Sequence, residues 1–97
     1  EIGKGTKISN SKIMGSVKIG RNSTITNSTI GAGTSIGSEC SINHSTMRNT
    51  ILMDNGTIDN VEGVVNSVIG KNSSVKSHSK FVGNIQFMIG DDSGILL

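Results

Sequence analysis

Residues 23–37 read STITNSTIGAGTSIG and contain one short pattern three times. In each copy a small residue is followed two positions later by isoleucine, at Ile25, Ile30 and Ile36. Residues two apart in a β-strand point to the same side, so the small residue and the isoleucine share one face. The stretch therefore predicts three short strands, each with both of these side chains turned inward.

The same pattern extends over most of the chain. Its large member recurs every five or six residues, and three steps usually span 17 residues, as from Ile2 to Ile19. An amphipathic helix requires a period near 3.6 residues and an exposed sheet a period near 2, so neither fits. The spacing predicts an all-β parallel β-helix, a triangular solenoid of roughly five to six coils. The large positions are Ile2, Ile8, Ile13, Ile19, Ile25, Ile30, Ile36, Ile42, Met47, Leu52, Ile58, Val64, Ile69 and Val75.

Small residues form a second inward column. They are expected at the corners of the triangle, where the interior is most crowded. Asparagine and glycine recur nearby, and they tolerate the positive φ that sharp outer turns require. The small positions are Thr6, Ser11, Val17, Ser23, Ser28, Thr34, Cys40, Ser45, Thr50, Gly56, Ser67 and Ser73.

The regular spacing stops near Val75. We assign residues 1–80 to the solenoid and residues 81–97, which hold both Phe81 and Phe87, to a C-terminal capping segment. A cap is expected because an open coil exposes unpaired strand edges. The chain begins within a repeat at Glu1, so we expect it to be an excised or processed piece of a longer protein.

Composition argues against several classes of function. The formal net charge is +2 and aromatic residues make up 2% of the chain. Near-neutral charge disfavours electrostatic binding to nucleic acid or an anionic membrane, and the lack of aromatics disfavours base stacking. The single Cys40 cannot form an internal disulfide. No apolar run is long enough to span a bilayer.

The repeat resembles the hexapeptide repeat of left-handed parallel β-helix proteins, and this resemblance implies the left-handed sense of the coil. Three segments resemble one family more specifically: residues 49–58 read NTILMDNGTI, residues 64–70 read VVNSVIG and residues 89–93 read IGDDS. In this order they are similar to the C-terminal β-helix of long-form glucose-1-phosphate thymidylyltransferases. A basic stretch that the family carries before the final Gly-Asp is missing, since residues 83–86 read GNIQ.

The resemblance implies a division of labour. In that family an N-terminal domain joins a sugar 1-phosphate to a nucleoside monophosphate, uses Mg²⁺ and releases pyrophosphate. Its Gly-rich phosphate loop is absent from this sequence, so no catalytic, cofactor-binding or metal-binding residue is transferred. We expect a scaffold and oligomerisation module, inactive in nucleotidyl transfer by itself. Its expected partners are the catalytic domain of the same chain and further copies, as a trimer or as side-by-side or stacked solenoids.

Two histidines are candidates for general acid–base chemistry. His44 follows Ile42 by two residues on an expected turn, and some hexapeptide acyltransferases use a histidine base at a subunit boundary. The favoured interpretation is a solvated turn histidine, because no step of the repeat leaves room for the long loop that acyltransferases usually carry. His78, near the predicted cap, has the same favoured interpretation.

Four further residues have a structural interpretation beside a functional one. Glu62 falls in the inward small column, where an unpaired carboxylate would be costly, so we expect either an outward bulge or a salt bridge at a subunit boundary. Asp91 and Asp92 favour a turn over a metal site. Cys40 occupies a slot usually filled by serine, which favours a buried small group over a nucleophile.

Three functional hypotheses remain. The first is the scaffold of a sugar-1-phosphate nucleotidylyltransferase, which implies a cytoplasmic protein. The second is a structural solenoid that stacks into filaments, which implies an extracellular one. The third and weakest is a hexapeptide acyltransferase, which requires a histidine site and a groove for the acyl donor.

Overall fold

The computed structural model describes residues 1–79 and 82–97 in full, together with the backbone of residues 80 and 81. The Phe81 side chain, which the sequence assigns to the cap, lies outside the described residues. The described chain is all-β and contains no helix. It forms strands β1 (Lys7–Ser9), β2 (Lys12–Ile13), β3 (Val17–Ile19), β4 (Thr24–Thr26), β5 (Thr29–Ile30), β6 (Thr34–Ile36), β7 (Ser41–Asn43), β8 (Thr46–Arg48), β9 (Ile51–Leu52), β10 (Thr57–Val65), β11 (Val68–Ile69), β12 (Ser74–Ile85), β13 (Met88–Ile89) and β14 (Gly94–Leu96).

The strands stack into three flat faces of a parallel β-solenoid of about five turns. Face A holds β1, β4, β7, the start of β10 and of β12, and β14. Face B holds β2, β5, β8 and the ends of β10 and β12. Face C holds β3, β6, β9, β11 and β13. We number the coils upward, so that β1–β3 form coil 1 and β12–β13 form coil 5.

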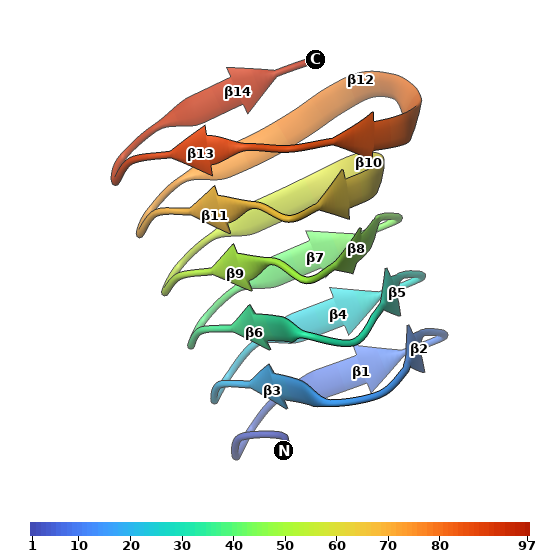
Figure 1. Cartoon of the computed structure of the whole chain (residues 1–97). Helices are drawn as coiled ribbons and strands as arrows, with labels where there is room; N and C mark the ends of the chain where they lie inside the picture. The colour runs from blue at the N-terminus through green and yellow to red at the C-terminus, as the bar shows by residue number, and fades with distance from the viewer.

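The solenoid winds in a left-handed sense. In Figure 1 the nearer strands β3, β6 and β9 run to the left, the paler strands β1, β4 and β7 behind them run to the right, and the chain climbs from N to C. This handedness agrees with the resemblance to hexapeptide proteins. The short connections between faces leave no space for the crossover helix that joins most parallel strands.

Stacking keeps identical positions above one another. Ile25 pairs with Ile8 in the coil below and with Ile42 in the coil above, so that each isoleucine packs on the next. The repeat is 17 residues through coils 1 and 2, and Ser35 pairs with Ile51 one residue early because one corner of coil 3 is shorter. Between coils 4 and 5 the offset grows to 20 residues, as Val68 pairs with Met88.

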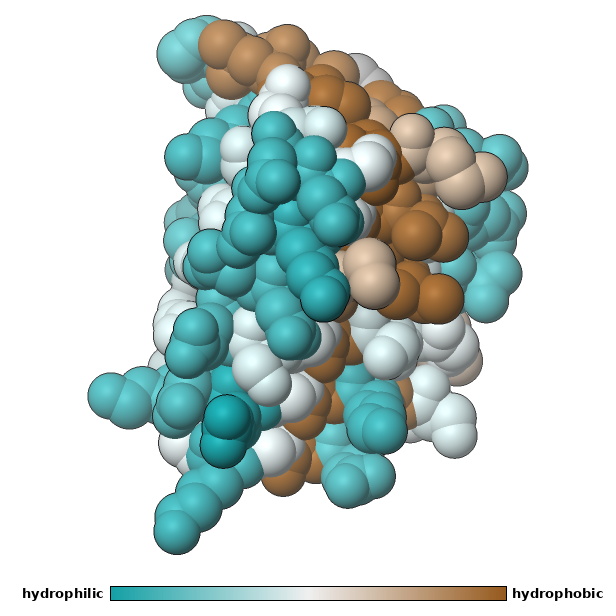
Figure 2. All heavy atoms as spheres, turned by 90° about the vertical axis from the view of Figure 1, so that its left-hand side faces the viewer, coloured by the Kyte–Doolittle hydropathy of each residue, from teal (hydrophilic) through white to brown (hydrophobic). Residues whose placement is uncertain are grey.

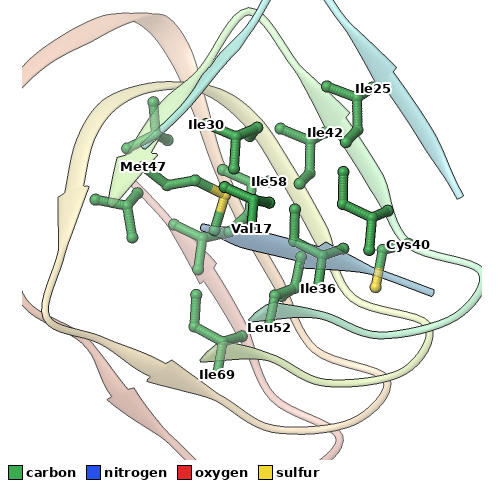
Figure 3. Packing of buried hydrophobic residues seen from close by; sticks show 14 of the residues in the cluster. Val17, Ile25, Ile30, Ile36, Cys40, Ile42, Met47, Leu52, Ile58 and Ile69 are labelled. Carbon is green, nitrogen blue, oxygen red and sulfur yellow. The ribbon is translucent and has the colours of Figure 1, made fainter. Parts of the chain in front are cut away.

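A single column of aliphatic side chains from each face fills the interior. Figure 3 shows labelled members of this core pointing inward from the surrounding ribbon. The buried apolar set contains Val17, Ile19, Ile25, Ile30, Ile36, Cys40, Ile42, Met47, Leu52, Ile58, Val61, Val64, Val65, Ile69, Val75 and Phe87. Of the apolar residues that the sequence leaves available for either core or surface, Val17 and Met47 are therefore in the core. Met14, Ile51, Met53 and Val68 are exposed.

The assignment of Glu62 to the inward column is wrong. Val61 occupies that place and is fully buried, while Glu62 is half-buried and pairs with Thr46 on the outside of face B. The shift arises at a β-bulge between Glu62 and Val64. Gly63 has a φ of 106° there, and a Cβ on it would collide with the carbonyl of Gly83 in the coil above. The bulge is possible because this residue has no side chain.

The predicted capping segment contributes strands to two faces. Within residues 82–97, β13 extends face C by pairing with β11, and β14 extends face A by pairing with β12. The corner between faces A and B is wider in coil 5, because β12 runs through it as one continuous strand (Figure 1). The role of residues 81–97 as a cap stays a prediction.

Replacing Ile36 by asparagine should destabilise the solenoid far more than replacing Lys18 by asparagine. Ile36 is buried between Ile19 and Leu52, so the change removes an aliphatic side chain and buries an amide, at a cost of about 3–5 kcal/mol. Lys18 lies outward on the same face and should cost less than about 0.5 kcal/mol. Urea unfolding measures both; equal midpoints would contradict the inward assignment.

Candidate functional site

One residue with left-handed backbone conformation marks each corner of each coil. Between faces A and B this column consists of Asn10, Asn27, His44 and Asn60, all with φ between 49° and 64°. Asparagine adopts this conformation more readily than other side chains because its short amide can bond locally. His44 thus occupies a corner position that its neighbours fill with asparagine.

The structure places both histidines on the surface. His44 and His78 are exposed, and neither ring hydrogen-bonds to a described residue. A general base is normally oriented by a second side chain, which neither ring has here. The solvated-turn interpretation therefore describes the geometry of His44 in this chain.

Asp91 and Asp92 close a turn between faces C and A. The Asp91 carboxylate accepts the Lys71 backbone N–H at 2.8 Å, and the Asp92 carboxylate accepts the Asn72 side-chain amide at 3.0 Å. These bonds continue an amide ladder in which Asn55 donates to Asn72 at 2.8 Å. Among the described residues no group of three or more His, Cys, Asp or Glu side chains could hold a metal ion.

The small inward residues contribute hydrogen bonds as well as fitting the corners. Ser28 donates its hydroxyl proton to the Thr26 carbonyl at 2.7 Å and accepts the Ser45 backbone N–H at 3.2 Å. Ser45 then accepts the Val61 N–H at 3.1 Å in the next coil. Each hydroxyl thereby pairs a buried amide that turns away from the regular ladder at the corner. The sequence gives the small size and the Ser/Thr preference, but not this second role.

One member of the corner columns lacks a partner. The Thr34 hydroxyl is buried, and no described residue hydrogen-bonds to it. One coil above, at the same corner, the buried Thr50 hydroxyl donates to the Arg48 carbonyl at 2.8 Å. Two equivalent threonines thus differ in whether their hydroxyl is satisfied.

Thr34→Val should raise stability and Thr50→Val should lower it, each by about 1 kcal/mol. Valine has nearly the shape of threonine, so the first change removes only an unsatisfied buried hydroxyl, and the second removes a hydrogen bond. Thermal and urea unfolding of the two variants measure the effect. Equal destabilisation by both would show that the Thr34 hydroxyl has a partner.

Cys40 occupies the serine column between faces C and A. Its backbone N–H donates to the Ser23 hydroxyl at 3.1 Å, and its thiol donates to the Met53 carbonyl at 3.2 Å. Burial raises the pKa of the Cys40 thiol, and the nearby Asp54 carboxylate adds to this, although backbone hydrogen bonds led by that to Gly56 act the other way. A buried thiol held neutral is a packing group and not a nucleophile.

Alkaline pH should destabilise the protein through Cys40. The raised pKa means that the folded state keeps the thiol proton after the unfolded chain has lost it, so stability falls as pH rises above the ordinary thiol pKa. Cys40→Ser removes this titration and keeps a small polar group in a serine column. Between about pH 7 and about pH 10, the variant should lose less stability than the wild type. Parallel losses in both proteins would rule out the Cys40 contribution.

The outer side of face C carries the largest change in character along the solenoid. One outward residue from each coil lies in register with the next, from Lys18 to Ser35, Ile51, Val68 and Met88. The first two are polar, and the last three are apolar with exposed fractions of 47%, 38% and 88%. Figure 2 shows hydrophobic surface on the right in the upper half, giving way to polar surface below.

We call Ile51, Val68 and Met88 the apolar stripe. Met53, also exposed, lies two residues beyond Ile51 and enlarges the same region. Contiguous exposed apolar side chains on a small protein mark interaction surfaces more often than single ones do. The sequence identifies Ile51 and Val68 as candidates for packing against a partner, and the register adds Met88 to them.

Comparisons with known proteins add no name to this fold. A scan against protein-family models finds no match, and a search of curated proteins finds none either. The described residues contain no helix that could span a membrane.

Proposed function

We propose that this chain is the scaffold and oligomerisation β-helix of a sugar-1-phosphate nucleotidylyltransferase of the glucose-1-phosphate thymidylyltransferase type, a cytoplasmic enzyme. Two things support the proposal. The segments at residues 49–58, 64–70 and 89–93 resemble that family. The apolar stripe gives the solenoid a surface suited to a second copy, and this single observation carries the oligomerisation part.

Side-by-side packing of parallel solenoids suits the stripe best. With both axes in the same direction, Ile51, Val68 and Met88 of one copy meet the same residues of another. With opposed axes, the stripe would face Lys18 and Ser35. Rotation about an axis parallel to the solenoids closes such an assembly as a dimer or trimer.

Charge favours the opposite arrangement but is the weaker effect. Residues 1–48 hold six of the nine Lys and Arg, and residues 49–97 hold five of the seven Asp and Glu. Opposed axes would therefore bring unlike charges together. Exposed ion pairs contribute roughly 0–1 kcal/mol, whereas complete burial of one aliphatic side chain contributes roughly 1.5–3 kcal/mol. Burial along the stripe should decide the orientation.

Val68→Lys should abolish self-association while leaving the fold intact. Val68 is at the middle of the stripe and points outward, so a lysine there places a charge in the interface without entering the core. Ser35→Lys is a matched control, because it adds the same side chain to the same column two coils lower. Light scattering across micromolar concentrations measures the mass, and circular dichroism checks folding. A monomeric wild type, or equal effects of both variants, would contradict this interface.

End-to-end stacking into filaments is the second candidate. It is favoured by exposed apolar side chains in the last coil and in β14, namely Val82 and Leu96 at 70% and 63%. Stacking would pair strand edges of successive copies and give open assemblies. Leu96→Lys should then break the association and Val68→Lys should not, which separates the two modes in the same scattering experiment.

The link to nucleotidyl transfer has its own test. The coding sequence upstream of residue 1 should encode a domain with a Gly-rich phosphate loop and carboxylates that hold Mg²⁺. The complete protein should then release pyrophosphate from a sugar 1-phosphate and a nucleoside triphosphate. An upstream region that encodes only a signal peptide would refute the enzyme link and support the structural solenoid.

A further inference from the structure

A notch interrupts the outer surface where face B turns toward face C. The outward residues there follow the stacked core positions Ile13, Ile30 and Met47 by one residue. They are Met14, Gly31 and Arg48, with Val65 above them. Gly31 provides no side chain, so a gap remains between the exposed side chains of Met14 and Arg48. The resulting cavity has a volume of about 160 Å³.

The walls of the notch combine an apolar part with hydrogen-bond donors. Met14, Val64 and Val65 supply the apolar part, and Arg48 and Asn84 supply a guanidinium and an amide. No described residue forms an ion pair or side-chain hydrogen bond with Arg48. Its guanidinium presents donors in a planar fork suited to a carboxylate.

Thr46 adds a third donor at the bottom of the notch. Its hydroxyl oxygen accepts the Gly63 backbone N–H at 2.7 Å. Because that contact uses a lone pair, the hydroxyl proton remains available for a ligand. The bulge at Gly63 thus fixes the threonine that faces the cavity, and it brings Gly63 itself to the lining.

The geometry points to a binding site for a short-chain carboxylate, such as butyrate. Pockets for drug-sized ligands measure roughly 300–1,000 Å³, so this volume limits the ligand to a few heavy atoms. One cation matches a monoanion, whereas a phosphate dianion normally requires more donors and charge. The carboxylate would lie on Arg48 with Asn84 and Thr46 nearby, and the alkyl chain would cover Met14 and Val64.

This site is independent of the proposed interface. The notch opens at the outer side of faces B and C, and none of Ile51, Val68 and Met88 lines it. Failure of one proposal therefore leaves the other standing.

Titration with sodium butyrate, followed by backbone amide NMR, tests the site. Saturable shifts should be confined to the amides of Gly31, Thr46, Arg48 and Gly63, with millimolar affinity. n-Butanol at the same concentration should shift these amides far less, and n-butylammonium should not shift them. Shifts that do not saturate, that spread over the whole solenoid, or that n-butylammonium reproduces would overturn the proposal.

Arg48→Gln and Arg21→Gln form a matched pair for the same titration. Both arginines are exposed, so both variants should melt at the wild-type temperature. Arg48→Gln should weaken butyrate binding at least tenfold, because it removes the charge and the fork. Arg21, on the corner between faces C and A, should have no effect. Unchanged affinity in Arg48→Gln, or equal weakening in both variants, would show that the notch does not bind the carboxylate.

Discussion

The structure depends on how buried amides are satisfied where the chain turns a corner. A flat face forms regular hydrogen bonds to the coils above and below, but at a corner the N–H of a buried residue turns away from them. A serine hydroxyl two residues before the aliphatic position accepts this N–H, as Ser28 does for Ser45. On the outside of the same corner a residue such as Asn27 adopts a left-handed conformation with φ of 50°. Together these two requirements fix residue type at the corners, and the aliphatic column fills the space between them.

These requirements explain how much could be predicted from the sequence. The inward residues Ser23 and Ile25 have only one interpretation at this spacing, so face, column and solenoid follow from the pattern. Local irregularities do not follow. The bulge at Gly63 moves Val61 into the column in place of Glu62, because one glycine shifts the register without changing the apolar count. The free hydroxyl of Thr34 was equally hidden, since a threonine there looks like every other member of its column.

The candidate surfaces were less predictable than the core for a physical reason. A core position has one environment, which its neighbours in the coils above and below repeat. An outward position such as Ile51 faces solvent in a single chain, and the pattern alone cannot say whether it is tolerated or used. The register supplies the missing information, because it places Ile51, Val68 and Met88 in one line. The notch at Gly31 was not predicted for a similar reason: a glycine next to a turn is expected for backbone reasons, and only the stacking of Met14 and Arg48 around it creates a cavity.

A repeat protein also provides its own comparison between equivalent positions. Lys18, Ser35, Ile51, Val68 and Met88 occupy matching places on face C, and the backbone makes the same demand of each. Folding therefore cannot explain why the column is polar in coils 1 and 2 and apolar in coils 3 to 5. Exposed apolar residues in successive coils also carry a risk of aggregation. A difference that the fold does not require, and that exposes the chain to this risk, indicates a contact outside the chain. The upper half of face C is thus the part of this solenoid whose sequence is best explained by a partner.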